Sequence, residues 1–168
     1  MIPKKLHFVW VGDESKRPDN CIQSWAKLNP EYEIVIWGNT ALSEYSWVNK
    51  KHMDAMYSRE LNGVADLMRY EILFNEGGIA LDADSLCLRP LEDWLLEPAA
   101  FAAWEHEHIR PGLITVGAMG AEPELLSRKW DLYAQEELPN IYTIPCFTDL
   151  FCDYIIQEAE ACNCWTVD

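Results

Sequence analysis

Two spacings of apolar side chains alternate along the chain and predict alternating strands and helices. Short runs rich in apolar and β-branched residues predict strands, whereas apolar positions that recur every three or four residues predict helices. The expected strands span residues 6–10, 33–37, 79–81, 99–104 and 114–118, and the expected helices span 19–28, 64–76, 91–96, 123–135 and 147–159. This order indicates one α/β domain over residues 1–168, built on a parallel or mixed sheet flanked by helices. Residues 38–62 are polar and mixed, and the pattern predicts no element there.

The helix expected at 64–76 has a broad apolar surface that includes Met68 and Ile72, as a helix packed on a sheet requires. Gly77 is placed to end it with a left-handed backbone. Asp66 and Arg69 are three residues apart and so are neighbours on one face of this helix. They form either an ordinary intrahelical ion pair or a fixed acid and guanidinium directed at a polar ligand.

Asp82 and Asp84 follow the apolar run 79–81, directly after Gly77-Gly78. If the strand continues through them, both side chains point to the same face, because strand side chains alternate. Two converging carboxylates at the end of a buried strand need a cation or hydrogen-bond donors. A hard divalent metal shared with an anionic substrate is the simplest partner. Solvated loop acids or helix caps remain the alternative for an isolated Asp-x-Asp.

Several sequence blocks in order resemble the DXD glycosyltransferases of family 32. This family includes fungal mannosyltransferases and bacterial capsular polysaccharide transferases, and the glucosylating clostridial toxins are more distantly similar. The similarity covers residues 2 to about 92. It rests on residues 2–12, Ser24-Trp25, residues 29–33, Trp37, residues 64–73, residues 77–84 and Arg89-Pro90-Leu91.

The resemblance implies a compact GT-A-like, Rossmann-type mixed sheet and a retaining sugar transfer, as in polysaccharide biosynthesis. The donor would be a UDP- or GDP-sugar, the metal Mn²⁺ or Mg²⁺, and the acceptor a glycan, a lipid-linked sugar or a protein. No obvious protein nucleophile is expected, and no Ser-His-Asp or Cys-His signature contradicts this.

The same resemblance implies a role for each candidate residue. Val9 and Trp10 would contact the nucleobase, with the indole stacking on it, although a core aromatic is the plain alternative for Trp10. Asp66 and Arg69 would hold sugar hydroxyls or phosphate. Asp84 would be the more direct metal ligand, and Asp82 would contact ribose or sugar and share the metal. Catalysis is therefore expected to depend on Asp82, Asp84 and Arg69.

The chain has 28 acidic and 13 basic residues and a net charge of −15. This charge disfavours nucleic acid and anionic membranes as partners, because both need a basic patch. It also means that an anionic donor needs a metal and a few local cations.

No secretory signal or transmembrane segment is visible, so we expect a cytoplasmic protein. The six cysteines are then expected to be reduced thiols. A metal clip of Cys162 and Cys164 with Cys146 and Cys152 matches no common zinc spacing.

Some positions depart from the family pattern. Relatives usually carry Asn in the loop after the strand expected at 99–104, where this chain has Arg110-Pro111-Gly112. Residues 105–108 alternate acid and imidazole, and they form either metal or acceptor contacts or an exposed polar loop. Relatives are commonly longer, with a C-terminal residue completing the metal shell, so the chain is either a minimal enzyme or lacks a tail. The possible substitutes are Asp149, Asp153 and Asp168.

Three other functions fit parts of the sequence. Residues 79–84 also resemble the nucleophile motif of haloacid-dehalogenase-type phosphatases, but that motif normally lies near the N-terminus. A calcium loop starting at Asp82 is rejected, because Leu86 replaces an oxygen ligand and Cys87 replaces the needed glycine. A non-catalytic nucleotide-sugar or glycan-binding module remains open.

Overall fold

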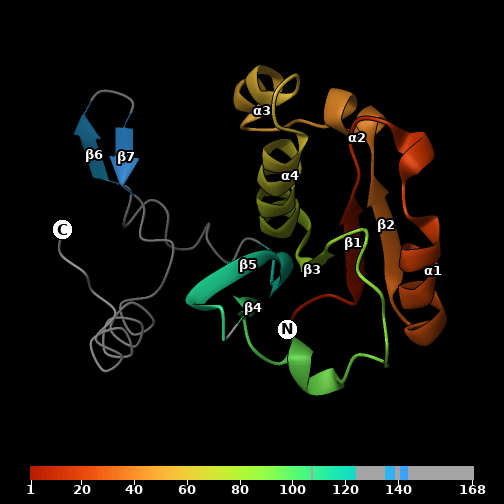
Figure 1. The fold of residues 1–168 in the computed structure, drawn as a ribbon. Coiled ribbons are helices and arrows are strands. Elements are labelled where there is room, and N and C mark those ends of the chain that lie inside the picture. The colour runs from red at the N-terminus through yellow and green to blue at the C-terminus, as the bar shows by residue number, and fades with distance from the viewer. Residues whose placement is uncertain (107, 124–134, 139–140, 144–168) are drawn as a thin grey trace. The chain divides into compact units, whose positions relative to one another are not determined.

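The computed structural model describes residues 1–106, 108–123, 135–138 and 141–143. Figure 1 shows the elements and their order along the chain. The strands are β1 (Lys5–Val9), β2 (Glu33–Trp37), β3 (Gly78–Leu81), β4 (Ala100–His106), β5 (Arg110–Ala121), β6 (Gln135–Leu138) and β7 (Ile141–Thr143). The helices are α1 (Asp19–Leu28), α2 (Asn39–Glu44), α3 (Lys50–Met56) and α4 (Leu61–Glu76), with 3-10 turns η1 (Glu14–Lys16) and η2 (Asp93–Leu96).

The chain forms two compact units. One comprises residues 1–103 and 114–125, and the other comprises residues 104–113 and 126–168. The second unit contains the antiparallel pair of β6 and β7, in which Leu138 lies opposite Ile141. The candidate residues of the sequence analysis, from Val9 to Asp84, all belong to the first unit.

The main sheet has the strand order β2-β1-β3-β5-β4. β1 is parallel to both of its neighbours, and β3 is antiparallel to β5. From β1 the chain passes through α1 to β2 on one side, and it later returns through α4 to β3 on the other side. The direction of the strand order therefore reverses at β1. In open α/β sheets, ligands bind at such a switch point, beyond the carboxyl ends of the strands. The mixed α/β fold predicted from the sequence is confirmed.

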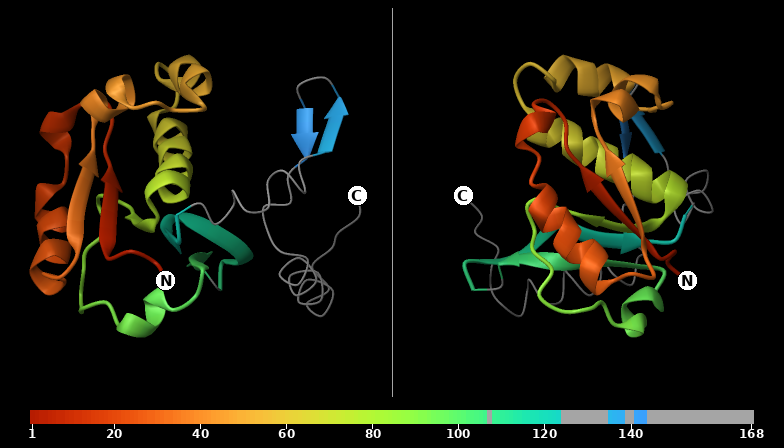
Figure 2. Two further views of the ribbon diagram at one scale, coloured as in Figure 1. Left: turned by 180° about the vertical axis from the view of Figure 1, so that it is seen from behind. Right: turned by 90° about the vertical axis from the view of Figure 1, so that its right-hand side faces the viewer.

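Helices cover both faces of this part of the sheet, with α1 and α4 on opposite sides (Figure 2). Leu6 and Phe8 of β1 lie in one buried cluster with Ile22 of α1. Val9, one residue on, lies in a second cluster with Met68 of α4. This alternation follows from the two-residue period of a strand. Burying each large apolar side chain contributes about 1.5–3 kcal/mol, so both helices are held firmly to the sheet.

A buried histidine sets the start of β3. Trp37 Nε1 donates a hydrogen bond to His7 Nδ1 (3.1 Å), so the proton of the neutral ring is on Nε2, which donates to the Gly77 carbonyl (2.8 Å). Gly77 and Gly78 have φ angles of 63° and 93°, which favour glycine. A Cβ on Gly78 would lie 2.9 Å from His7 Nε2 and 2.9 Å from the Lys5 carbonyl oxygen. The Gly77-Gly78 pair thus lets β3 begin close beside β1.

The element predictions are mostly confirmed. The helix at 19–28 and the strand at 33–37 have the predicted bounds, and α4 begins at Leu61 rather than at residue 64. The short helix expected at 91–96 is the 3-10 turn Asp93–Leu96, and β5 is longer than predicted. The pattern missed α2 and α3, which have six and seven residues and no side-chain hydrogen bond at the N-cap. Helices this short depend on tertiary packing rather than on local propensity.

The C-terminal predictions are tested only at a few positions. Gln135 begins β6, so the helix expected at 123–135 is wrong at that end, and residues 124–134 lie outside the described residues. The helix expected at 147–159 also lies outside them. Cys21 and Cys87 are free thiols as expected, whereas Cys146, Cys152, Cys162 and Cys164 are not described. Among the described helices, none combines the length and apolarity that crossing a bilayer requires.

His7→Gln is expected to remove a contribution to the free energy of unfolding that the wild type itself loses at low pH. Burial is the largest cause that lowers the pKa of His7 below its ordinary 6.5, so the folded chain binds a proton less readily than the unfolded chain. Stability from the neutral ring is therefore full above pH 6.5 and falls as the pH decreases toward the folded-state pKa. At a pH of about 8 the variant should be less stable by roughly 1–3 kcal/mol, because Trp37 and Gly77 lose partners.

Urea unfolding at a pH of about 8 and about 5.5 measures this difference. The gap between wild type and variant should narrow at the lower pH. His52→Gln, at an exposed position of α3, is the matched control and should follow the wild-type curve. A gap that stays constant with pH would contradict a neutral structural role for His7.

Candidate functional site

Asp82 and Asp84 lie at the carboxyl edge of β3, in the turn that follows the strand. β3 ends at Leu81, and the Asp82 carbonyl accepts hydrogen bonds from Ser85 N (3.0 Å) and Ser85 Oγ (2.6 Å). A turn, rather than strand alternation, therefore places the two carboxylates. The Asp82 side chain is 44% exposed, and Asp84 is exposed with no hydrogen bond or ion pair to another described residue.

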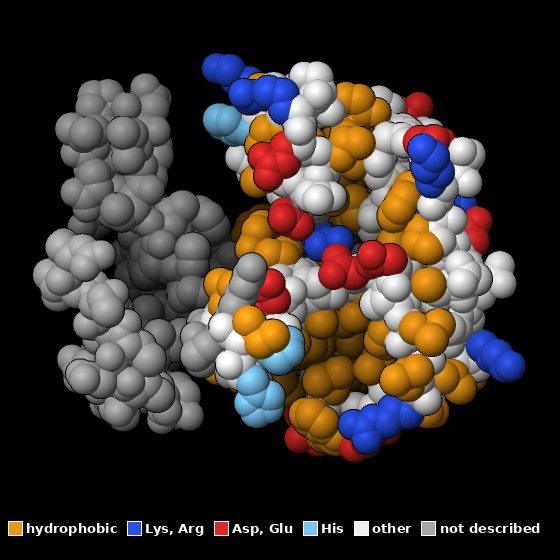
Figure 3. Space-filling view, viewed as in Figure 1, with side chains coloured by type: hydrophobic (Ala, Val, Ile, Leu, Met, Phe, Trp, Pro, Cys, Tyr) orange, Lys and Arg blue, Asp and Glu red, His pale blue; other side chains and the backbone are white. Residues whose placement is uncertain are grey.

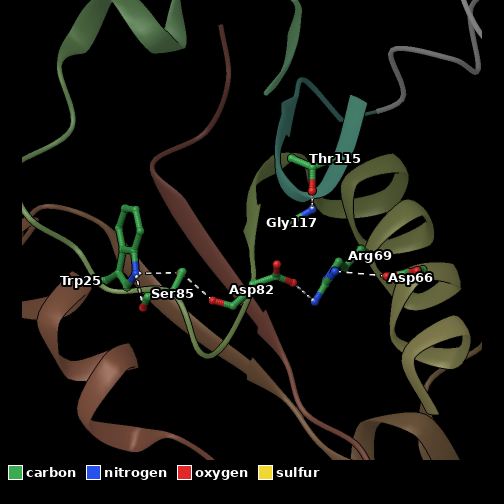
Figure 4. A network of polar contacts seen from close by, with 7 residues as sticks. All are labelled: Trp25, Asp66, Arg69, Asp82, Ser85, Thr115 and Gly117. Atoms are coloured by element: carbon green, nitrogen blue, oxygen red, sulfur yellow. Dashed lines mark hydrogen bonds and ion pairs between the residues drawn. The ribbon is translucent and has the colours of Figure 1, made fainter. Parts of the chain in front are cut away.

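Arg69 connects α4 to this turn. Its Nη2 lies 2.5 Å from Asp82 Oδ1 and its Nη1 lies 3.1 Å from Asp66 Oδ1. Figure 4 shows the guanidinium between the two carboxylates, with Ser85 on the other side of Asp82. The Arg69 side chain is only 10% exposed, and its buried Nε has no hydrogen-bond partner among the described residues. The intrahelical pair is thus present, but Arg69 also forms a second ion pair across the fold.

The protonation of Asp66 reflects this arrangement. Burial raises the pKa of the Asp66 carboxyl above its ordinary 3.8, the charge of Asp82 raises it further, and the Arg69 guanidinium opposes both. Burial therefore outweighs the attraction of the Arg69 guanidinium, and the charge of Asp82 adds a smaller upward shift to the pKa of Asp66.

Helix α1 supports the turn from the other side. Trp25 Nε1 donates to the Ser85 carbonyl (3.0 Å) and lies 3.1 Å from Ser85 Oγ. Ser24 Oγ accepts from Cys87 N (2.9 Å). These contacts give a structural reason for the Ser24-Trp25 block that carried part of the family resemblance.

Buried Asn29, just after α1, continues this support along the segment that follows the aspartates. Its Oδ1 accepts from Leu91 N (2.7 Å), and its Nδ2 donates to the Trp25 carbonyl (3.0 Å). The segment 85–91 is therefore fixed by hydrogen bonds at both of its ends.

Val9 and Trp10 lie at the end of β1, beside the aspartates. In the parallel register Phe8 pairs with Leu81, so residues that follow β1 and β3 meet at the same edge of the sheet. Val9 is 3% exposed and belongs to the core, so its side chain is not available to a ligand. Trp10 is half-buried, packs against the cluster that includes Ala83, and donates from Nε1 to the Asp13 carbonyl (3.0 Å).

The loop after β1 is held by a residue that the sequence analysis did not select. The Asn39 side chain pairs with the Gly12 backbone, accepting from Gly12 N (2.9 Å) and donating to Gly12 O (2.7 Å). Glu14 Oε1 in turn accepts from Asn39 N (2.7 Å). An Asn 27 residues away from its partner leaves no signal in the sequence.

Gly117 of β5 was also not selected, although its carbonyl accepts from Asp82 N (2.9 Å). A lone glycine in an apolar strand predicts only a bulge or a close approach of another group.

The residues present fit a divalent metal held together with substrate. Carboxylate oxygens are suitable ligands for Mn²⁺ or Mg²⁺, and Mg²⁺ commonly takes one or two protein carboxylates plus phosphate oxygens. Within the described part of the chain, no group of three His, Cys, Asp or Glu side chains is placed to hold a metal without substrate. Figure 3 shows acidic side chains around a basic one near the middle of one face, beside a recess lined by hydrophobic side chains.

The other proposed metal contacts are not tested. His106 and His108 have ring centroids 6.2 Å apart and belong to the second unit. Asp149, Asp153 and Asp168 lie outside the described residues.

Comparisons with known proteins identify a family whose matched region contains these residues. A family described as "Glycosyltransferase sugar-binding region containing DXD motif" matches residues 15–101. Inositol phosphoceramide mannosyltransferase 3 of Schizosaccharomyces pombe is 35% identical over 106 residues, 58% of this chain and 28% of the relative. "Subversion of eukaryotic traffic protein A" of Legionella pneumophila is 29% identical over 126 residues, 60% of this chain and 20% of the relative.

A solved structure titled "PaToxG Glycosyltransferase" superposes with a TM-score of 0.59 at 16% identity, covering 78% of this chain and 60% of that one. This likeness shows the fold alone. The chain spans between a fifth and about 28% of the length of the two relatives named above.

The ion-pair network predicts opposite shifts of the Asp66 pKa in two variants. In metal-free buffer, Arg69→Gln should raise this pKa further, because the opposing cation is lost. Asp82→Asn should lower it toward 3.8, because a neighbouring negative charge is removed. The pH dependence of the Asp66 carboxyl carbon NMR shift measures both. Shifts of the same sign in the two variants would rule out this charge arrangement.

Proposed function

The chain belongs to the glycosyltransferases whose sugar-binding region contains a DXD motif, and we propose that it transfers a sugar from a nucleotide diphosphate sugar to a carbohydrate-type acceptor. The proposed reaction depends on a divalent metal and retains the anomeric configuration. The acceptor is a glycan, a lipid-linked sugar or a protein.

One observation carries the proposal: buried Arg69 is held by Asp66 and Asp82 at the carboxyl edge of β3, next to exposed Asp84. A fixed cation with adjacent carboxylates on a switch-point edge suits a ligand that carries both hydroxyls and phosphate. In a chain of net charge −15, such a local cation is needed to admit an anionic donor.

Each residue has a proposed role. Asp84, which has no described protein partner, would be the more direct metal ligand, and Asp82 would share the metal and contact ribose or sugar. Asp66 would accept hydrogen bonds from sugar hydroxyls. Trp10 would stack on the nucleobase, and the Val9 backbone would contact its edge.

The chemistry follows from charge development in the transition state. When the bond between sugar and phosphate breaks, positive charge grows on the anomeric carbon and negative charge grows on the leaving diphosphate. Arg69, fixed before the reaction, would stabilise the diphosphate without reorganisation. A bound Mn²⁺ or Mg²⁺ would supply Lewis-acid stabilisation of the same leaving group.

Two alternative functions from the sequence analysis, a phosphatase and a non-catalytic binding module, are supported to different degrees. The family match includes Asp82 and Asp84, which speaks against the haloacid-dehalogenase-type phosphatase. A non-catalytic nucleotide-sugar or glycan-binding module is the second alternative that the sequence leaves open. Binding of a nucleotide sugar without transfer or hydrolysis under any metal would favour the module. Cytoplasmic location and polysaccharide biosynthesis stay predictions from the sequence.

Asp84→Asn is expected to weaken metal-dependent nucleotide binding. Without the anionic oxygen the metal loses its exposed protein ligand, so the affinity for UDP or GDP in Mn²⁺ should fall at least about tenfold, or ~1.4 kcal/mol. Titration calorimetry of both nucleotides with Mn²⁺ and with EDTA measures this. Asp54→Asn on α3 removes an equal charge away from the aspartates and should bind as wild type. Equal wild-type affinity in EDTA would overturn the metal requirement.

Trp10→Leu tests stacking on the base. The variant keeps an apolar side chain but has no π face, and stacking on a base contributes roughly 1–3 kcal/mol in single-stranded nucleic acid complexes. Nucleotide affinity should therefore fall, and the quenching of tryptophan fluorescence by nucleotide should decrease. Trp94→Leu, at an exposed position of η2, is the matched control. Lower stability of Trp10→Leu with unchanged nucleotide affinity would show that the indole is only part of the core.

A further inference from the structure

Gly117 is a glycine that its own backbone does not require. Its φ angle lies outside the left-handed region, where Gly12, Gly77 and Gly78 are found, so other residues can adopt the same backbone. Glycine inside a strand also weakens the strand, because it orders more backbone and packs no side chain. A glycine at this position is therefore explained by a neighbouring group that leaves no room for a side chain.

The neighbouring group is the Asp82 carboxylate. An ideal Cβ built on Gly117 would lie 2.3 Å from Asp82 Oδ2, which is closer than real Cβ atoms come. It would also lie 3.0 Å from Asp82 Cγ and 3.2 Å from Thr115 Oγ1, both tighter than most real Cβ contacts. The antiparallel register pairs Leu81 with Ala118, so Asp82 and Gly117 come next to each other along the same ladder. The Asp82 carboxylate thus occupies the space that a side chain at 117 would fill.

Both backbone polar groups of Gly117 are hydrogen-bonded. Its N–H donates to Thr115 Oγ1 (3.0 Å), and its carbonyl accepts from Asp82 N (2.9 Å). Figure 4 shows Thr115 and Gly117 above the Asp82 carboxylate, with Arg69 beside it. On one side Asp82 is limited by β5, and on the other its Oδ1 contacts Arg69 Nη2 at 2.5 Å.

We propose that Gly117 is a positioning residue: its missing Cβ lets the Asp82 carboxylate lie against β5, which sets its contact with Arg69 and its presentation to the donor. The presentation of Asp82 to the donor rests on the proposed function. Gly117→Ala would rotate the carboxylate away, because an Asp side chain turns more easily than a paired strand moves. Arg69, nine-tenths buried and with an unpartnered Nε, would then lose its second ion pair.

The first experiment uses no substrate. Thermal unfolding is compared among wild type, Gly117→Ala, Asp82→Ala and the double variant. Gly117→Ala should lower the wild-type Tm by about 2–4 °C, which corresponds to a loss of about 1 kcal/mol in a chain of this size. In the Asp82→Ala background it should leave the Tm unchanged or raise it, because the clash with the carboxylate is gone and alanine restricts the unfolded chain. The remaining close contact, with Thr115 Oγ1 at 3.2 Å, needs a shift of only a few tenths of an ångström. Equal losses in both backgrounds would overturn the proposal.

The second experiment measures the affinity for UDP and GDP in Mn²⁺, a property that a purely structural role would leave intact in the folded variant. Gly117→Ala should bind at least about tenfold more weakly, and the double variant should bind no worse than Asp82→Ala alone. Gly63→Ala on α4 is the control, because its Cβ would meet only the flexible end of Met56 at 2.2 Å and more distant Glu60 atoms. Unchanged affinity in Gly117→Ala would overturn the positioning role.

Failure of the proposed function would look different. A wild-type chain that binds neither nucleotide would overturn that function and the part of this proposal that concerns the donor. The thermal comparison would still decide whether Gly117 sets the geometry of Asp82 and Arg69.

Discussion

The ion pair between Arg69 and Asp82 is the contact on which the rest of the site depends. It joins the middle of α4 to the end of β3 through a guanidinium that is nine-tenths buried. Burying a cation is costly unless carboxylates meet it with good geometry. Here Asp66 and Asp82 both do so at exposures above 40%, which leaves them accessible to a ligand. The charge is therefore fixed by the fold and still available for chemistry.

The scaffold around this contact is arranged to hold one short turn. His7 and the Gly77-Gly78 pair place the start of β3 directly beside β1. Trp25 holds the residues after Asp82 from α1, and Gly117 limits the carboxylate from β5. Elements from both faces and both neighbouring strands thus determine where the two aspartates lie. Such support from rigid elements is what keeps a binding geometry reproducible.

The comparisons show the family of the chain, whereas the substrate remains part of the proposal. The family match covers residues 15–101, which contain α1, α4 and both aspartates. The two relatives named above extend far beyond the region that aligns with this chain. The residues that match the family include Arg69 and the two aspartates, so the proposed function concerns donor binding most directly.

The sequence by itself determined the elements whose apolar spacing is regular, such as α1 and β2, and the candidate residues Arg69, Asp82 and Asp84. The elements could be predicted because strand and helix periods are local. The candidate residues were selected by the family resemblance, since the Asp-x-Asp and Asp66–Arg69 spacings alone also fit solvated acids and an ordinary ion pair. The tertiary structure decided that Arg69 pairs with Asp82, that a turn and not a strand places Asp82 and Asp84, and that Asn39 and Gly117 support the site. These contacts join residues distant in sequence, and their geometry depends on strand register, which is set only when the helices pack on both faces of the sheet.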